Sequence, residues 1–134
     1  YGVNIFYITN RKEKYREATL KNLRDHNLPQ AETEHLFMRT STSSKKERRE
    51  KVQEDYHIAL LIGDNLNDFS EIFEHKSNHR RKKLVDRHRE EFGRRFILLP
   101  NATYGDWEAA VYDYDFSLDE KAKHKERLNS LKAF

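Results

Sequence analysis

The strongest constraint on the fold comes from residues 57–62, which read HIALLI and stop at Gly63. Apolar and polar side chains do not alternate in this run, as they would in a strand with one face in water. Strands covered on both faces have this pattern and are typical of parallel sheets packed between helices. The run therefore predicts a buried strand in the parallel sheet of an α/β fold.

Other short apolar segments predict the rest of the sheet. Residues 2–8 (GVNIFYI) and 96–99 (FILL) are composed of strand-type side chains, and residues 35–39 (HLFMR) form a shorter candidate. The expected helices are 11–26, 43–55, 77–93 and 118–131. Ser43 or Ser44 is the expected N-cap of the second helix, in a capping box with Glu47. Ser77 is the expected N-cap of the third helix and Gly93 its stop, and Asp119 lies near the start of the last. Because strands and helices alternate, we expect one α/β domain over residues 1–134.

Composition excludes several classes of function. The chain has no cysteine, which excludes disulfides, thiolate nucleophiles and thiolate metal sites. No segment approaches the roughly 18 apolar residues of a membrane helix. Lys and Arg number 26 against 23 Asp and Glu, and the net charge of +3 is compatible with anionic ligands. The basic run 79–89 (HRRKKLVDRHR) contains an apolar stripe and is interpreted as a solvated helix face, so nucleic acid is not an expected partner.

Each strong strand candidate is followed by small or polar residues. The three exits are Thr9 and Asn10, Gly63 and Asp64, and Pro100 and Asn101. Ligands of open parallel sheets bind in the crevice at the carboxyl ends of the strands. We therefore expect the three exits to converge on one pocket.

The residues at these exits each have two interpretations. Asp64 and Asp68 are either turn and helix-cap residues or oxygen ligands for Mg²⁺. Thr9 and Asn10 are either a strand residue and a turn former or part of a phosphate cradle. Lys45 belongs either to a solvated face or to an oxyanion site. His75 and His79 flank an expected helix start, so they are interpreted as solvated rather than as a metal pair.

Four segments resemble motifs of one enzyme family: FYITNR (6–11), SKKER (44–48), IGDNLNDF (62–69) and LLPNATYGDWE (98–108). In this order, over nearly the whole chain, they look like the bacterial class C acid phosphatases. That family includes outer-membrane lipoprotein 5′-nucleotidases and belongs to the haloacid dehalogenase superfamily. The resemblance implies a Rossmann-like parallel sheet flanked by helices, of which this chain would be the C-terminal portion.

The resemblance implies a role for each matching residue. Thr9 would contact the transferring phosphoryl group through its hydroxyl, with the backbone of Asn10 beside it. Lys45 would neutralise the phosphate, and its neighbour Lys46 is a rival for that role.

The same resemblance implies a metal and a substrate contact. Asp64 would bind Mg²⁺ directly, and Asp68 would act through water or through neighbouring groups. Tyr104, with Trp107, would offer an aromatic face to a substrate base or ring.

One motif of the superfamily is absent from the chain. A nucleophilic Asp and a general-acid Asp two residues later should directly follow an apolar strand, and no such DxD follows one here. Asp113 and Asp115 have the spacing but lack the strand, so they are interpreted as a surface turn. The resemblance therefore implies that the nucleophile lies upstream of Tyr1.

The functional expectation is Mg²⁺-dependent hydrolysis of phosphate monoesters, nucleoside monophosphates among them, through an aspartyl-phosphate. The alternative is a binding protein of the same fold that captures a nucleotide or another phosphorylated ligand without chemistry. The resemblance further implies export to the bacterial periplasm or outer membrane. An upstream lipid anchor would be the one contact with the membrane. The resemblance is also compatible with a homo-oligomer.

Overall fold

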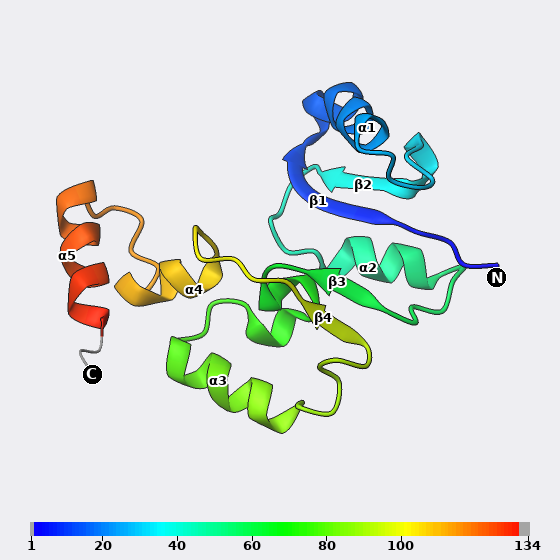
Figure 1. Cartoon of the computed structure of the whole chain (residues 1–134). Coiled ribbons are helices and arrows are strands. Elements are labelled where there is room, and N and C mark those ends of the chain that lie inside the picture. The colour runs from blue at the N-terminus through cyan, green and yellow to red at the C-terminus, as the bar shows by residue number, and fades with distance from the viewer. Residues whose placement is uncertain (1, 132–134) are drawn as a thin grey trace. The chain divides into compact units, whose positions relative to one another are not determined.

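The computed structural model describes residues 2–131, and the chain divides into two compact units, Tyr1–Ile58 and Ala59–Phe134. Each unit contains a pair of parallel strands joined through helices, as Figure 1 shows. This arrangement confirms the predicted α/β class with parallel strands. The expectation of one domain over the whole chain stays a prediction.

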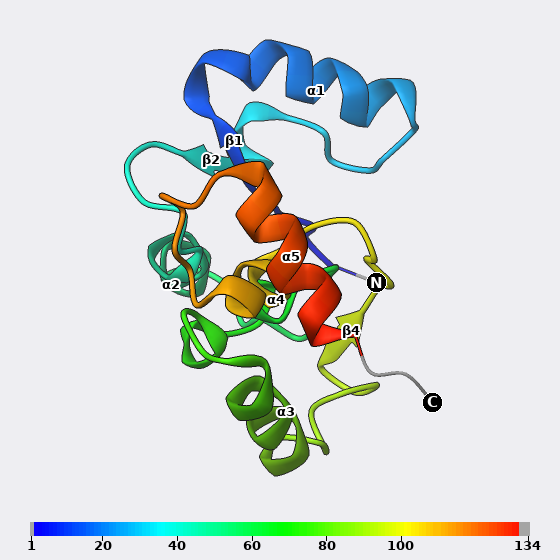
Figure 2. The ribbon, with the colours of Figure 1, turned by 90° about the vertical axis from the view of Figure 1, so that its left-hand side faces the viewer.

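The first unit is built on the strands β1 (Tyr7–Lys12) and β2 (Leu36–Arg39) and the helices α1 (Arg16–Asp25) and α2 (Lys46–Gln53). In the parallel ladder, Tyr7 lies opposite Leu36 and Ile8 opposite Phe37. Figures 1 and 2 show α1 and α2 on opposite sides of this strand pair. The two helices therefore flank the strands, as the α/β pattern predicts.

Three buried side chains pack together in the core of the first unit: Leu20 of α1, and Leu36 and Met38 of β2. Their two β2 members are two residues apart, which puts both on the same face of the strand. Burying a side chain of this kind contributes about 1.5–3 kcal/mol. The core therefore holds α1 against β2.

The second unit pairs β3 (Leu61–Gly63) with β4 (Phe96–Leu98), which lie parallel with Ile62 opposite Ile97. Its helices are α3 (Asn78–Arg87), α4 (Asp106–Ala109) and α5 (Glu120–Ser130). Short 3₁₀ turns cover η3 (Leu66–Asp68), η4 (Glu71–Phe73) and η5 (Ala110–Tyr112).

Aromatic rings form the centre of the second unit. Phe69 stacks on Phe96 with ring centroids 5.0 Å apart, and Phe92 meets both rings edge to face. Phe73 is fully buried and also packs edge to face on Phe92. Aromatic pairs in these geometries add about 0.5–1.5 kcal/mol beyond the burial of their area. This cluster fixes the segment after β3 against β4.

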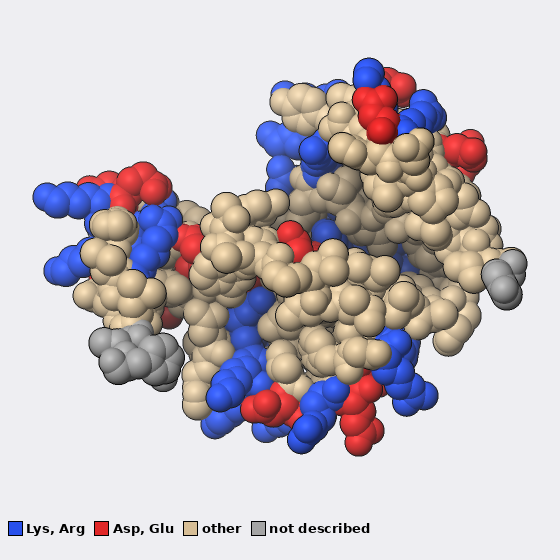
Figure 3. Space-filling view, in the orientation of Figure 1, with Lys and Arg blue, Asp and Glu red and all other residues tan. Residues whose placement is uncertain are grey.

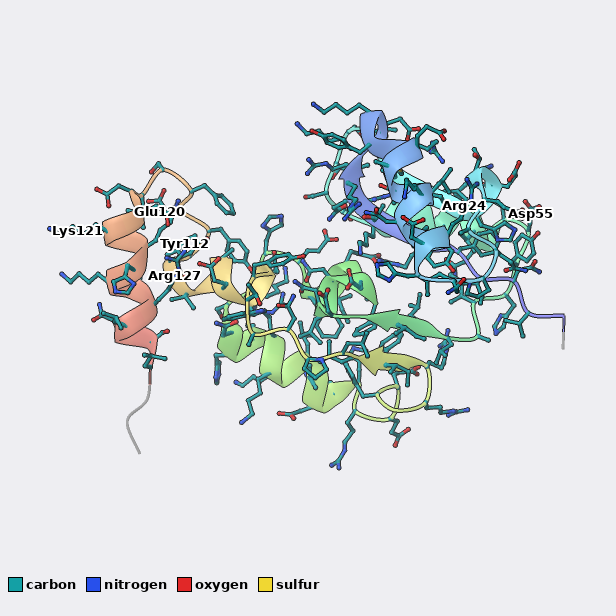
Figure 4. The ribbon with its side chains drawn as sticks, turned by 45° about the horizontal axis from the view of Figure 1, so that its top comes forward. Arg24, Asp55, Tyr112, Glu120, Lys121 and Arg127 are labelled. Atoms are coloured by element: carbon teal, nitrogen blue, oxygen red, sulfur yellow. The ribbon has the colours of Figure 1, made fainter. Side chains whose placement is uncertain are left out.

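Helix α5 is attached to η5 and α4 through polar side chains. Figure 4 shows Tyr112 and Arg127 directed toward each other, and the guanidinium carbon lies 5.9 Å from the centre of the Tyr112 ring. Both residues also donate to Glu108, Arg127 Nε at 2.7 Å and the Tyr112 hydroxyl at 2.9 Å. These contacts hold α5 against α4 and η5.

The strands differ from their predicted bounds. The predicted strand 2–8 is found at Tyr7–Lys12, because β2 begins at Leu36 and offers no partner before Tyr7. Thr9 and Asn10 therefore lie within β1, in the stretch between Ile8 and Lys12 where the register of the ladder shifts, and not beyond the end of the strand. The predicted strand 57–62 is found only at Leu61–Gly63, and it is not covered on both faces, since Ile62 is 61% exposed.

The helices agree with prediction where a polar side chain caps them. The hydroxyl of Ser77 accepts from the Arg80 amide at the start of α3, and the Asp119 carboxylate accepts from the Ala122 amide at the start of α5. Helix α3 ends at Arg87, so Gly93 is not its stop. The predicted start of α2 is partly confirmed, because the Ser44 hydroxyl accepts from the Lys46 amide at 3.3 Å. Lys45 occupies the N-cap position, so Glu47 is the second residue of the helix and not the third, which a capping box needs.

Candidate functional site

The two strand exits of the second unit meet at one edge. Asp64 directly follows β3, and Asn101 follows β4 by three residues. The side-chain amide of Asn101 donates to Asp64 Oδ2 at 2.9 Å. Parallel strands end at the same edge of a sheet, which is why residues far apart in sequence come together here. This part of the predicted convergence is confirmed.

Asp68 holds the loop that carries Asp64. Its Oδ2 atom accepts from the backbone amide of Asp64 at 3.1 Å and from that of Asn65 at 3.0 Å. Asn65 caps η3 in return, so the two side chains form a capping box. Asp68 is thus the third residue of a short turn, and the interpretation of Asp68 as the cap of a following helix is wrong.

Gly63 is required by this close approach. A Cβ atom on Gly63 would lie 2.6 Å from the Cβ of Asp68, which is closer than real contacts allow. The last residue of β3 must therefore be glycine for the Asp68 carboxylate to reach the two loop amides.

The chemistry of Asp64 fits a hard divalent cation. Its carboxylate is exposed at the end of β3, and carboxylate oxygens are the ligands that Mg²⁺ prefers. Within residues 2–131, however, no group of three or more His, Asp or Glu side chains could hold a metal ion. Among the described residues, Asp64 thus offers one exposed carboxylate to such an ion at this edge.

A cavity of about 550 Å³ opens beside Asp64. Its lining includes Asp64, Asn65, Arg81, Asn101 and Trp107. The indole Nε1 of Trp107 is buried and has no hydrogen-bond partner among the described residues. Tyr104 is 69% exposed and is not part of the lining. The substrate contacts assigned to Tyr104 and Trp107 stay predictions, and the cavity supports Trp107 more directly.

In the first unit, Arg48 binds Thr9 and Asn10, the two residues that the sequence analysis assigned to a phosphate site. Its guanidinium donates to the backbone carbonyl of Thr9 at 2.5 Å, to Asn10 Oδ1 at 2.7 Å and to the carbonyl of Ser44 at 2.8 Å. Partial burial, together with the charges of Arg39 and Arg49, lowers the pKa of Arg48. Sequence reasoning missed Arg48, although it stands within the SKKER motif.

Lys45 and Lys46 differ in their surroundings. Lys46 is exposed, and its ammonium lies 3.7 Å from Glu50 one helical turn later. Lys45 is half-buried at the N-cap of α2, next to the Ser44 carbonyl that Arg48 binds. These surroundings favour Lys45 over Lys46 as the lysine that contacts phosphate. That role of Lys45 stays a prediction.

Arg81 is the most important residue that sequence reasoning placed wrongly. It was assigned to a solvated helix face, yet it is only 3% exposed. Its neighbours Arg80, Lys82 and Lys83 are exposed as predicted, and Figure 3 shows basic side chains over α3 on the face in view. A cation buried among exposed ones indicates that it has specific acceptors.

Asp113 and Asp115 lie in a turn, as predicted. Asp113 has a left-handed backbone (φ 50°), and the Asp115 carboxylate accepts from the amide and hydroxyl of Ser117. Those bonds lower the pKa of Asp115. Neither residue follows a strand, so the turn does not have the geometry of a strand-borne DxD motif.

Comparison with known proteins links this geometry to one family. The model of the family described as HAD superfamily, subfamily IIIB (acid phosphatase), matches residues 1–107. The class C acid phosphatase from Bacillus anthracis is 44% identical, with a TM-score of 0.93 over 99% of this chain and 56% of that one. The structure of that enzyme with tungstate bound is 43% identical, with the same TM-score and coverage.

The chain thus spans about 56% of the length of the solved structures that it matches. Among the helices in the described part of the chain, none has both the length and the apolar character needed to cross a membrane.

Proposed function

Because the chain belongs to the acid phosphatases of subfamily IIIB in the HAD superfamily, we propose that it takes part in the hydrolysis of phosphate monoesters. The observation that carries the proposal is the bond between Asn101 and Asp64 at the carboxyl edge of β3 and β4. This edge is where α/β folds place their ligands, and the cavity beside it can admit one.

The nucleophile of this reaction lies outside these 134 residues. A carboxylate oxygen of an upstream Asp forms a bond to phosphorus while the ester P–O bond breaks, and a second Asp gives its proton to the leaving alcohol. Water then attacks the aspartyl-phosphate and releases inorganic phosphate. Two facts support this: no DxD follows an apolar strand here, and the matched structures are longer than this chain.

Asp64 would be the residue of this chain that holds the metal, and we propose Mg²⁺ as the ion. When bound, the cation would offset negative charge on the phosphoryl oxygens. Asp68 keeps Asp64 in place because its carboxylate accepts from the backbone amides of Asp64 and Asn65. Thr9 would donate its hydroxyl to a phosphoryl oxygen beside the backbone of Asn10, and Lys45 would place a positive charge near the same oxygens.

The experiment is a phosphate-release assay on the natural-length protein with p-nitrophenyl phosphate, with Mg²⁺ and with a chelator. Release that needs Mg²⁺ and is inhibited by tungstate supports the proposal, since a related structure binds tungstate. Tight binding of a phosphorylated ligand with no phosphate release would instead favour the alternative, a non-catalytic binding protein.

Three finer proposals rest on the family resemblance. Nucleoside monophosphates are the proposed substrates, with Tyr104 and Trp107 against the base. Export to the periplasm or outer membrane as a lipoprotein is the proposed location, which cell fractionation and labelling with a fatty acid would test. A homo-oligomer is the proposed assembly, which light scattering of the purified protein would test.

A further inference from the structure

Arg81 of α3 donates to four acceptors on three other segments of the second unit. Its Nη1 atom donates to Asn67 Oδ1 at 3.0 Å, to the Phe73 carbonyl at 2.6 Å and to Asp106 Oδ2 at 2.8 Å. Its Nη2 atom donates to Asn65 Oδ1 at 3.2 Å. Two of these acceptors, Asn65 and Asn67, belong to the loop that begins at Asp64.

The ion pair of Arg81 and Asp106 is largely shielded from water. The side chains of Arg81 and Asp106 are 4% and 16% exposed. Asp106 Oδ2 also accepts from the Tyr114 hydroxyl at 2.8 Å and from the His75 amide at 3.3 Å. Burial and the bond to Asp106 raise the pKa of the Tyr114 hydroxyl, which therefore remains a protonated donor.

The start of α4 restrains the same loop from a second direction. Gly105 precedes α4 with a φ of 150°, and a Cβ atom on Gly105 would collide with the side-chain amide of Asn65. Asn65 thus packs against the backbone before Asp106 while its other amide atom binds Arg81. The loop, α3 and α4 are therefore fitted to one another around Asn65.

From these contacts we propose that Arg81 is a positioning residue: it holds the Asn65–Asn67 loop so that the Asp64 carboxylate faces the cavity. The inference rests on the proposed role of Asp64 as a metal ligand. Arginine suits this task because its planar fork reaches several acceptors at once, whereas the ammonium of lysine acts as a point charge. Arg81 itself contacts neither metal nor substrate in this role.

The test compares Arg81→Lys with Arg80→Lys in the natural-length protein. Arg80 is the exposed neighbour on α3, so its variant controls for a changed basic residue in that helix. Mg²⁺ affinity is measured by calorimetry. Hydrogen exchange of the Asp64 and Asn65 amides, which donate to Asp68, reports on the loop without any need for activity.

In Arg81→Lys we expect the Mg²⁺ dissociation constant to rise about tenfold or more, as for other groups that orient a ligand. The Asp64 and Asn65 amides should exchange faster while the amides of α3 do not change. In Arg80→Lys both quantities should match the unaltered protein. If Arg81→Lys also matches it in both quantities, the proposal is overturned.

A second variant covers the case in which Arg81→Lys does not fold. Asn67→Ala removes one loop acceptor and leaves the bonds of Arg81 to Phe73 and Asp106. Faster exchange at Asp64 and Asn65 in this variant supports the proposal, and unchanged exchange overturns it. If the unaltered protein neither binds Mg²⁺ nor releases phosphate, the proposed function fails, and amide exchange alone still decides the role of Arg81.

Discussion

The backbone amide of Asp64 donates to the carboxylate of Asp68 at 3.1 Å. The two acidic residues of the GDNLND segment therefore have different tasks, although the sequence presents them as a pair. Asp64 directs its carboxylate to Asn101 and the cavity, whereas Asp68 directs its own to the loop backbone. Their substitutions should have different consequences.

Asp64→Asn should nearly abolish phosphate release and weaken Mg²⁺ binding, because an amide is a poorer ligand than a carboxylate. The melting temperature should stay near that of the unaltered protein, since the change is almost isosteric. Activity and calorimetry measure the first effect and a thermal melt the second.

The control for that prediction is Asp113→Asn, in the turn with the rival DxD spacing. Asn tolerates the left-handed backbone of this position, so activity and stability should both be retained. Full activity in Asp64→Asn together with loss in Asp113→Asn would reverse the assignment of the site.

Asp68→Asn should reduce activity less than Asp64→Asn does, because it leaves the metal-facing carboxylate in place. Asp68→Ala should lower the free energy of unfolding by about 1–3 kcal/mol, since the two loop amides lose their acceptor. Denaturant titration measures the second effect. An Asp68→Asn variant as inactive as Asp64→Asn would indicate that Asp68 is itself a direct ligand.

Gly63→Ala should act through Asp68, because the new methyl group would displace the Asp68 side chain from the loop amides. We expect lower stability and weaker Mg²⁺ binding. In the double variant with Asp68→Gly the Cβ atom that the new methyl group would meet is absent, so adding Gly63→Ala should cost little more. Additive losses of stability in the double variant would show that Gly63 matters for another reason.

Lys45→Met should reduce turnover by about 10²-fold or more, if its charge acts on the transferring phosphoryl group. Lys46→Met is the matched control and should be nearly silent, because exposed pairs such as that of Lys46 with Glu50 contribute about 0–1 kcal/mol. Steady-state kinetics measure both. A silent Lys45→Met beside a damaging Lys46→Met would move the phosphate lysine by one position.

Tyr104→Ala should raise KM for nucleoside monophosphates more than for a small alkyl phosphate. Stacking of a base on an aromatic ring contributes about 1–3 kcal/mol, and an alkyl phosphate has no base. Equal changes of KM on the two substrates would exclude base stacking by Tyr104.

The sequence by itself determined the local features. The α/β alternation, the caps Ser77 and Asp119 and the acidic residue after the HIALLI run all depend on neighbours a few residues away. Such features can be predicted because turn chemistry and strand periodicity act over short distances. The family resemblance likewise rested on short segments, and the family match confirms it.

Only the tertiary structure decided where the strands begin and which charges are buried. Strand β1 begins at Tyr7 because its ladder partner begins at Leu36, a residue far along the chain. Arg81 and Arg80 are adjacent in sequence and identical in type, yet Arg81 is buried because Asn65, Phe73 and Asp106 meet around it. A pattern along one helix cannot report acceptors that other segments bring to it, and this is why sequence reasoning found Asp64 but missed the arginine beside its loop.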